Sequence, residues 1–272
     1  MRRRGAVSAR LVTGLVVTGI ILGAALLSLV WTPFPVEGVK IMARLKPPGW
    51  PHLLGTDQFG RDLLSMMMVG ARNSLLIALG AVALGIGVGV PLGLLAAQRG
   101  GLADELVARG SDLVFAFPAL VTAAMLAALA GPGMENAILA IGIFNVPVFA
   151  RIARGQALAL WRRDFVLAAR ALGKSDIRIT RDHVLPNLAH VLIAQASIQA
   201  AMAILVESGL AYVGLGPQPP APSLGRMLAE AQTYVAMAPR LALAPGLLIV
   251  ATVIGLDLLG EGLSERHDRR SS

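Results

Sequence analysis

One short stretch of the chain carries charged side chains at a spacing that could support chemistry. Asp57, Arg61 and Asp62 place two carboxylates and a guanidinium within six residues. Paired carboxylates can act as a general acid and base, or they can hold a metal ion. The same residues also suit a capped turn that enters a helix, with Thr56 or Asp57 as the cap. The capped turn is the interpretation that we favour.

A second stretch matches a nucleotide-binding pattern in its letters. Ala168 and the run Gly173-Lys174-Ser175 fit the relaxed form of the P-loop motif. A phosphate cradle needs a glycine-rich loop after a strand and before a helix, so that backbone N–H groups converge. Here the residues before Gly173 are strong helix formers, and no apolar strand ending in Asp follows. We therefore predict that this chain does not itself bind ATP.

The other residue types that serve catalysis do not converge. The chain has no cysteine, which excludes disulfides, thiolate catalysis and cysteine-ligated metals. An intramembrane enzyme would need His, Asp or Glu side chains gathered within apolar segments, but the four histidines are scattered and mostly lie outside them. We expect no catalytic residue, no cofactor and no metal site on this chain.

The composition is that of an integral membrane protein. Hydrophobic residues make up 56% of the 272 residues, and charged residues make up only 15%. A soluble domain has about 25% charged residues. The formal net charge of +8 could suggest nucleic acid. We instead expect membrane lipid as the surroundings and no nucleic-acid partner, because basic residues of membrane proteins collect in cytoplasmic loops.

Six apolar runs predict an all-α fold with six transmembrane helices. The first run has 21 uncharged residues, enough to cross about 30 Å of hydrocarbon, and it is too long for the core of a cleaved signal peptide. The predicted spans are residues 11–31, 74–97, 113–130, 137–150, 188–206 and 241–256. We expect loops at 33–72, 98–112 and 212–240, with Glu207 ending the fifth span. This divides the chain into an amino-terminal helix and loop (1–72), a core (73–262) and a polar tail (263–272).

Basic residues predict the orientation of these spans. An even number of spans places both termini on one side of the membrane. That side carries 17 of the 24 Lys and Arg residues, eight of them between Arg151 and Arg181. Because Lys and Arg favour cytoplasmic loops, both termini are predicted to be cytoplasmic.

Small and polar residues inside the spans predict how the helices meet. Gly85, Gly89 and Gly93 form successive Gly-xxx-Gly pairs, which allow a neighbouring helix to approach closely. Pro91 and Pro147 indicate kinks in their helices.

Polar side chains within spans are functional candidates. Asn145, Gln195 and Gln199 are our candidates for a substrate pathway, and Gln195 and Gln199 lie one helical turn apart. The alternative for each is a hydrogen bond between helices. We hypothesise that the two glutamines face a pore.

A charged island at residues 163–187 separates the fourth and fifth spans. It predicts a helix that starts near Asp164 and stops at Gly173, followed by a second short helix that Ser175 can cap. Apolar residues of the first helix recur at spacings of three and four and predict one apolar face, made of Phe165, Ala168, Ala169 and Leu172. The fifth span is predicted to be entered at Pro186. Two short helices joined at a glycine would form a rigid lever between two spans.

The lever has two physical interpretations. An apolar and basic face suits docking into a groove of a soluble partner. The same face also suits a loop that lies on the membrane surface with one side in water. The residue pattern leaves both open.

Three ordered blocks of the chain resemble a known family. Leu167–Gly173 and the block His183-Val184-Leu185-Pro186-Asn187 are similar to the "EAA" loop of bacterial ABC-transporter permeases. The blocks at 55–62 and 214–223, and the ending at 259–263, resemble the C-type subunit of dipeptide, oligopeptide and nickel permeases. The resemblance runs from about residue 50 to the tail.

The resemblance implies a type I importer permease in the bacterial inner membrane that forms half of a pore and has cytoplasmic coupling helices. Its partners would be a related second permease, two ATPase subunits that bind ATP and magnesium, and an extracytoplasmic solute-binding protein. The residues that it assigns to ATPase coupling are Arg163, Asp164, Phe165, Leu167, Ala168, Ala169, Arg170, Leu172, Gly173, Ser175 and Asp176.

The chain departs from the family at Leu167, where the motif has Glu. Arg163, Asp164, Arg170 and Asp176 are candidates to replace that polar contact, with apolar docking through Phe165 and Leu172. We expect di- or oligopeptides as substrate, with nickel or another small solute as the alternative. An ion-coupled secondary transporter is less favoured, because it would need buried ion-coupling charges and few are available.

Overall fold

The computed structural model describes residues 9–271, and the regular structure of this part is helical. The elements in chain order are α1 (Ala9–Leu27), η1 (Ile41–Ala43), α2 (Leu63–Arg99), α3 (Gly101–Phe115), α4 (Ala119–Ala130), α5 (Met134–Trp161), α6 (Asp164–Ala171), α7 (Asp176–Ile179), η2 (Thr180–Val184), α8 (Leu185–Tyr212), α9 (Leu224–Ala231), η3 (Gln232–Tyr234) and α10 (Arg240–Ser271). An isolated β-bridge joins Thr56 and Asp62.

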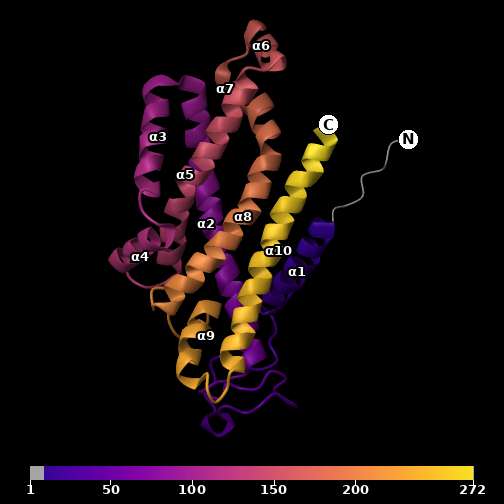
Figure 1. Ribbon diagram of the computed structural model, residues 1–272, viewed down its shortest axis with the longest axis vertical. Helices are drawn as coiled ribbons and strands as arrows, with labels where there is room; N and C mark the ends of the chain where they lie inside the picture. Colours follow the sequence, from indigo (N-terminus) through magenta and orange to yellow (C-terminus); the bar gives the residue numbers. More distant parts are fainter. Residues whose placement is uncertain (1–8, 272) are drawn as a thin grey trace, which may run out of the picture.

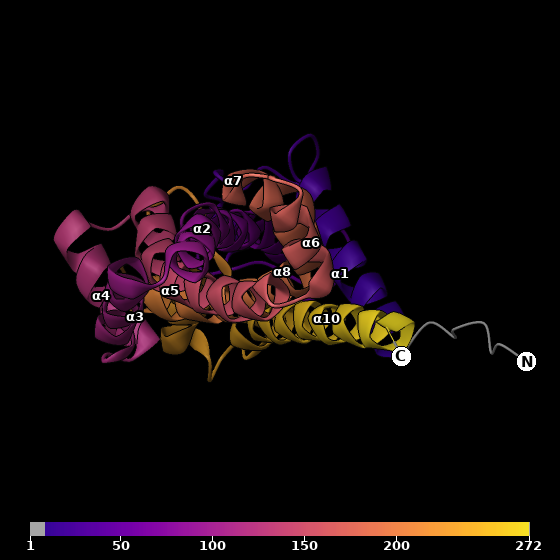
Figure 2. The same cartoon turned by 90° about the horizontal axis from the view of Figure 1, so that it is seen from above.

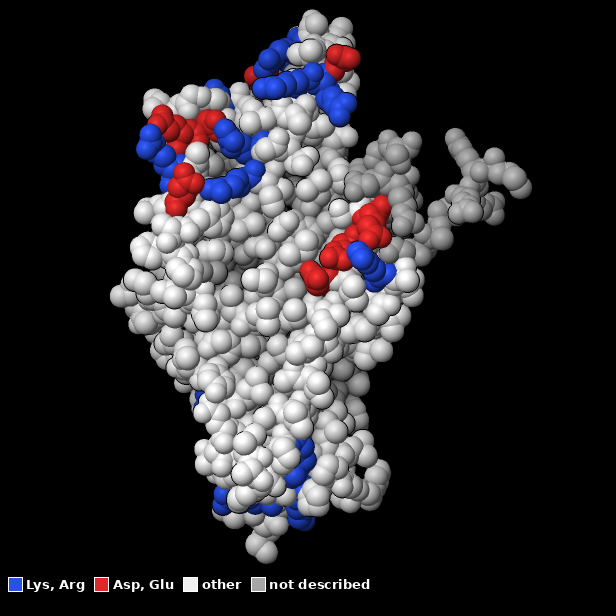
Figure 3. Space-filling model, viewed as in Figure 1, with Lys and Arg blue, Asp and Glu red and all other residues white. Residues whose placement is uncertain are grey.

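The long helices form a bundle suited to a membrane. Within the described residues, five helical stretches are long and apolar enough to cross, and α3 with α4 could make a sixth span that is bent by 89°. Figure 3 shows charged residues mainly near the two ends of the visible face, apart from one line near α10, with a wide uncharged region between them. The prediction of an all-helical membrane protein is confirmed.

The centre of the bundle is the packing of α2 against α5, and α8 lies beside both (Figure 2). A Cβ atom on Gly85 would lie 2.6 Å from the Cβ of Asn145, and one on Gly93 would lie 3.0 Å from the Cβ of Ala153. Neither separation leaves room for a side chain. The close helix approach predicted from the glycine pairs is therefore confirmed.

The first and last helices pack together along one side of the bundle (Figure 1). Arg10 of α1 forms ion pairs with Glu261 and Glu265 of α10, each with a distance of 3.0 Å. The start of α1 and the end of α10 therefore lie together, towards the end of the bundle that carries α6 and α7. We call this the α6 end, and we call the opposite end the α9 end.

The third predicted span is wrong as a continuous helix. The chain breaks between Phe115 and Ala119, inside the predicted run 113–130. Pro118 explains the break, because proline lacks an N–H group and disfavours helical backbone in the residue before it.

The loop predicted at 98–112 is also wrong, because α3 occupies most of it. Its mixed charges are used by the neighbouring helix: Asp104 pairs with Arg154, and Asp112 pairs with Arg151 at 2.6 Å. The segment of mixed charge predicted as a loop is therefore a helix that packs on α5.

Several spans extend beyond the apolar runs that predicted them. Helix α2 begins at Leu63, inside the predicted loop, and α8 continues past Glu207 to Tyr212. Helix α10 continues through the predicted polar tail as far as Ser271. Hydropathy alone does not mark these ends, since helical hydrogen bonding continues into polar sequence.

Candidate coupling interface

Helices α6 and α7 project beyond the bundle at the α6 end (Figure 1). Arg163 is the N-cap residue of α6 with extended backbone, and its carbonyl accepts the N–H groups of Val166 and Leu167. Asp164 occupies the first turn, where a carboxylate is favourable next to the helix dipole. The predicted start of this helix is confirmed.

The predicted glycine joint is also confirmed. Gly173 has a φ of +78°, which favours glycine. Its N–H donates to the carbonyl of Arg170 at 3.0 Å, and the N–H of Lys174 donates to the carbonyl of Ala169 at 3.2 Å. These two bonds form a Schellman motif, which ends α6 and satisfies its last carbonyl groups.

One arginine braces the joint. The Arg170 guanidinium lies over the Trp161 ring at 5.1 Å and forms an ion pair with Asp176 at 3.0 Å. It therefore connects the end of α5 with both short helices. Ser175 occupies the N-cap position of α7 as predicted, but its side chain makes no capping hydrogen bond.

The apolar face predicted for α6 is divided between two environments. Ala169 is buried together with Val166, and these two residues face the interior of the projection, where Ile179 and Val184 are also buried. Ala169 therefore does not belong to an exposed face, because it is buried in the same apolar cluster as these residues.

The remaining apolar residues of the projection are open to solvent. Leu172 is 84% exposed and Ile177 is 76% exposed, while Phe165, Leu167 and Ala168 are exposed to lesser degrees. We call these five residues the exposed coupling face. Ile177 is not part of the apolar face predicted from the sequence. A large apolar residue within a charged island was the signal that could have identified it.

The four residues proposed to replace the missing glutamate differ in their availability. Arg170 and Asp176 are occupied with each other. Arg163 and Asp164 are exposed, and neither has an ion-pair partner among the described residues. Both precede Leu167, which is 50% exposed, by about one helical turn. Arg163 and Asp164 are thus the charges free to contact a partner.

The return from the projection to α8 has no break. Helix α7, the π-helical turn η2 and α8 form one continuous helical stretch from Asp176 to Tyr212. Pro186, which was predicted to start the span, lies inside this stretch. Its missing N–H follows directly on η2, a turn with wider i→i+5 bonding such as that from Leu185 to Thr180.

The P-loop letters adopt a different geometry from a phosphate cradle. Helix α6 precedes Gly173 where a nucleotide-binding loop requires a strand. The Lys174 ammonium lies 3.1 Å from the His183 ring and 4.0 Å from the Asp182 carboxylate. His183 also contacts Phe165, with 6.2 Å between the ring centroids. These residues fix the return of the chain towards α8.

The polar residues proposed for a substrate pathway form a chain across two helices. Gln199 of α8 donates to the Asn145 side-chain oxygen of α5 at 2.9 Å, and Gln195 donates to Gln199 at 3.3 Å. Asn145 and Gln199 also line a small cavity of about 110 Å³ that is otherwise apolar. These groups thus make a hydrogen bond between helices, the alternative weighed above, and two of them also border a cavity.

A double substitution of Gln195 and Gln199 by Leu tests whether these two residues belong to the substrate pathway. We expect uptake to fall about tenfold or more, because Asn145 would lose its buried partner and the cavity would lose its polar groups. Initial uptake rates should be measured at matched membrane levels of both proteins. Unchanged uptake by the variant would sink the pathway hypothesis.

Glu207, which is predicted from the sequence to end the fifth span, is a buried carboxylate within α8. It is fully buried inside α8 and accepts a hydrogen bond from Ser74 of α2 at 2.8 Å. Next to it, Asn73 donates to the carbonyl of Pro222 at 2.7 Å. These bonds fasten the α9 end of α2 to α8 and to the segment that leads into α9.

The carboxylates at 57–62 form capped turns, as favoured above, but the predicted cap residue is wrong. Asp62 caps α2 by accepting from the Ser65 N–H at 2.9 Å. Asp57 instead accepts from the N–H groups of Phe59 and Arg61 and so closes the preceding turn. In the described part of the chain, no group of three His, Cys, Asp or Glu side chains could hold a metal ion.

A bundle of membrane-crossing helices with a braced two-helix projection at one end defines a multi-pass membrane permease. The family model of the binding-protein-dependent transport system inner membrane component matches residues 89–272. The chain therefore belongs to this family, whose members are permease components of ABC importers.

Relatives match most of the chain. The glutathione transport system permease protein GsiD of Pectobacterium atrosepticum is 38% identical over 87% of this chain and 79% of its own length. The di/tripeptide transport system permease protein DppC of Pseudomonas aeruginosa is 40% identical over 82% and 76%. The probable D,D-dipeptide transport system permease protein DdpC of Escherichia coli is 36% identical over 94% and 87%.

A solved structure has the same fold. The MetNI methionine ABC transporter, in an inward-facing conformation, contains a chain that matches with a TM-score of 0.61. The match covers 76% of this chain and 96% of that chain at 19% identity. The predicted permease fold is confirmed.

Proposed function

We propose that this permease imports short peptides by forming half of a pore with a related second permease. The three relatives described above are named as transporters of glutathione, di- and tripeptides, or D,D-dipeptides. Glutathione is itself a tripeptide, so these names share one chemical class. They favour peptides over nickel chelates and other small solutes, which the resemblance left open.

We propose that the exposed coupling face docks into a groove on an ATPase subunit, and that two such subunits hold ATP and magnesium. The observation that carries this proposal is the exposure of Leu172 and Ile177 on a projection that Arg170 braces. Large apolar side chains held rigidly in water suit a protein groove. Leu167 would contribute an apolar contact where the family motif has glutamate.

In the proposed mechanism, the continuous helix from Asp176 to Tyr212 transmits movement from the projection to the bundle. Closure of the ATPase pair on ATP would move α6 and α7, and α8 would carry that movement into the bundle. In this orientation the α6 end and both termini are cytoplasmic, and the α9 end faces the solute-binding protein. The Lys and Arg asymmetry of the sequence supports this orientation.

Reconstitution into liposomes tests the proposed function. The chain would be purified with its second permease and ATPase subunits, and the binding protein and labelled di- and tripeptides would be added outside. We expect peptide uptake that requires ATP inside the liposomes and is insensitive to proton ionophores. Uptake driven by a proton gradient without ATP would overturn the proposal, and uptake of nickel but not of peptides would overturn the substrate.

A further inference from the structure

The cavity beside Asn145 lies between α4, α5 and α8, within the part of the bundle that can cross the membrane. It has a volume of about 110 Å³. Each long helix lines it with residues at spacings of three and four, so one face of each helix borders the space. These faces include Ile141, Asn145 and Val148 of α5, and Gln199, Met202 and Val206 of α8. We call this space the Asn145 cavity.

The polar side chains of the cavity leave one hydrogen-bond donor unused. Gln195 donates to Gln199, and Gln199 donates to the Oδ1 atom of Asn145. The row ends at Asn145, which is 3% exposed and whose Nδ2 group has no hydrogen-bond partner among the described residues. This group carries two N–H donors, and a buried donor without an acceptor is unfavourable. A ligand that brings an acceptor into the cavity would therefore gain a hydrogen bond.

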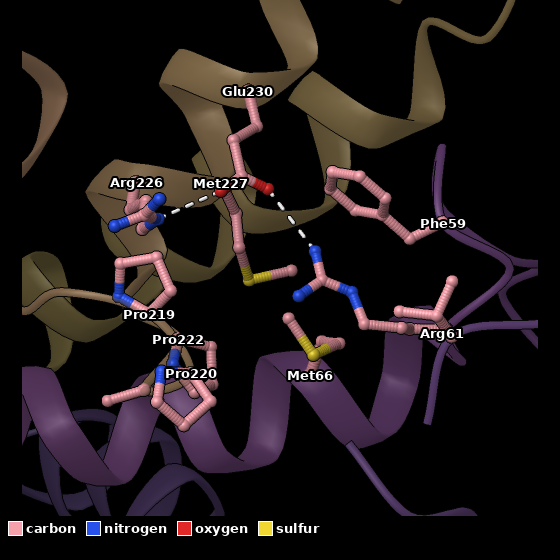
Figure 4. A pocket seen from close by; sticks show the side chains of 11 residues that line it. Phe59, Arg61, Met66, Pro219, Pro220, Pro222, Arg226, Met227 and Glu230 are labelled. Carbon is pink, nitrogen blue, oxygen red and sulfur yellow. Dashed lines mark hydrogen bonds and ion pairs between the residues drawn. The ribbon is translucent and has the colours of Figure 1, made fainter. Parts of the chain in front are cut away.

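The larger hollow at the α9 end differs in this respect. It has a volume of about 210 Å³, and three charged side chains line it. Glu230 binds Arg61 at 3.3 Å and Arg226 at 2.8 Å, as Figure 4 shows. The charges of that hollow therefore satisfy each other, whereas the Asn145 cavity holds a donor that lacks an acceptor.

The remainder of the Asn145 cavity suits an apolar group. Apart from Asn145 and Gln199, its lining residues are Ala, Ile, Val, Met and Phe. An apolar cavity of about 150 Å³ can hold benzene, so this smaller space suits a side chain such as that of valine or leucine. A fitting ligand combines such a group with a neutral acceptor a few bonds away. One apolar residue of a peptide has this chemistry, because its side chain and its carbonyl oxygen lie close together.

We infer that the Asn145 cavity is a subsite for one apolar residue of the transported peptide, whose carbonyl oxygen accepts a hydrogen bond from Asn145 Nδ2. The inference rests on the proposed function, which makes this chain half of a peptide pore. It goes further by naming the part of the peptide that this chain recognises. The subsite favours peptides that contain valine or leucine over peptides of glycine alone.

Filling the cavity tests the inference through the choice between two peptides. Ala123 of α4 lines the cavity and is 1% exposed, so Ala123→Leu would occupy the space. Uptake of Gly-Leu and of Gly-Gly should be measured with the complete transporter in proteoliposomes, at matched protein levels. We expect the ratio of Gly-Leu to Gly-Gly uptake to fall about tenfold or more, as for the loss of apolar contacts in a pocket. The same binding protein serves both transporters, so its own preference cancels in this comparison.

A second filling variant and a matched control complete this experiment. Ala203→Val adds two carbon atoms from the α8 side and should lower the same ratio by a smaller factor. Ala128→Leu places the same bulk at an exposed position of α4 outside the cavity, and it should keep the wild-type ratio. A wild-type ratio in both filling variants would overturn the inference, and so would an equal loss of the two peptides in both.

Removal of the donor has a different expected signature. Asn145→Leu should lower the uptake of Gly-Leu and of Gly-Gly by the same factor, about three- to tenfold, because each peptide has the carbonyl that the donor binds. The ratio between the two peptides should stay that of the wild type. Uptake equal to the wild type would overturn the assignment of Asn145 as a binding residue.

A photoreactive peptide locates the subsite directly. Glycyl-photoleucine carries a diazirine in its side chain, and it would be irradiated with the complete transporter during ATP-driven uptake. We expect mass spectrometry to find labels on Met202 and Val148, and excess Gly-Leu to remove them. Labels confined to other parts of this chain would overturn the inference. Labelling of the cavity by a photoreactive lipid chain that Gly-Leu does not displace would assign the space to lipid and overturn it as well.

Failure of the subsite can be told apart from failure of the proposed function. If the wild-type transporter imports neither peptide with ATP, the proposed function fails. If the wild type imports both peptides and the two filling variants keep its ratio, only the assignment of the subsite fails.

Discussion

A Gly173→Pro variant is expected to insert into the membrane but to lose nearly all ATP-driven uptake. Proline holds φ near about −65°, whereas Gly173 has a φ of +78°. Proline also removes the N–H that donates to Arg170 at the end of α6. The Schellman motif would be lost, and Arg170 would no longer be held against Asp176 across the joint. The exposed coupling face would then lose its fixed geometry, while the packing of α2 with α5 would remain.

Two measurements and one control define this result. Peptide uptake and ATP hydrolysis should be compared in proteoliposomes, with the protein level in membranes as the measure of insertion. We expect hydrolysis that the binding protein no longer stimulates. Gly173→Ala keeps the N–H and costs about 1–2 kcal/mol for its left-handed backbone, so it should retain part of the uptake. Normal transport by the proline variant would show that the joint does not transmit movement.

A Gly89→Leu variant is expected to lower the stability of the folded bundle, whereas Gly87→Leu is not. A Cβ on Gly89 would meet the backbone of α5 at the Val146 carbonyl and lie 3.0 Å from the Ala150 nitrogen. Backbone atoms cannot rotate away as a side chain can, so α2 and α5 would have to separate. Overpacking of this kind costs about 1–3 kcal/mol or more. The expected result is a lower midpoint of thermal unfolding in detergent.

Gly87 is the matched control for this experiment. It lies two residues away in the same helix, and a Cβ there would meet nothing within 4 Å. Leucine favours helix over glycine by about 0.5–1 kcal/mol, so Gly87→Leu should be neutral or slightly stabilising. Equal midpoints for the two variants would contradict the assignment of the α2–α5 contact as the centre of the fold.

Local signals predicted the helix boundaries of the α6–α7 projection. The start of α6 near Asp164 and its end at Gly173 depend on a capping turn and on a backbone conformation that favours glycine. Both are properties of a few consecutive residues, so they could be recognised from the sequence. Which of the apolar residues remain exposed could not be recognised, because Ala169 is buried in the apolar cluster whereas Ile177 is 76% exposed.

Contacts between distant residues account for two of the predictions that were wrong. Glu207 could be placed at a span end because carboxylates avoid the membrane interior, but Ser74, 133 positions earlier, gives it a buried partner. The charges of α3 are typical of a loop, but Arg151 and Arg154 of α5 pair with two of them.

By itself, the sequence determined that the chain is a membrane bundle, where α2 and α5 approach closely, and where the α6–α7 projection has its glycine joint. These follow from hydrophobicity, small residues and helix-terminating residues, which act within one segment. Only the tertiary structure decided that Glu207 is buried, and that Met42 and Leu172 stand exposed at opposite ends. The physical reason is that burial is a property of two surfaces in contact, and the second surface comes from a distant part of the chain.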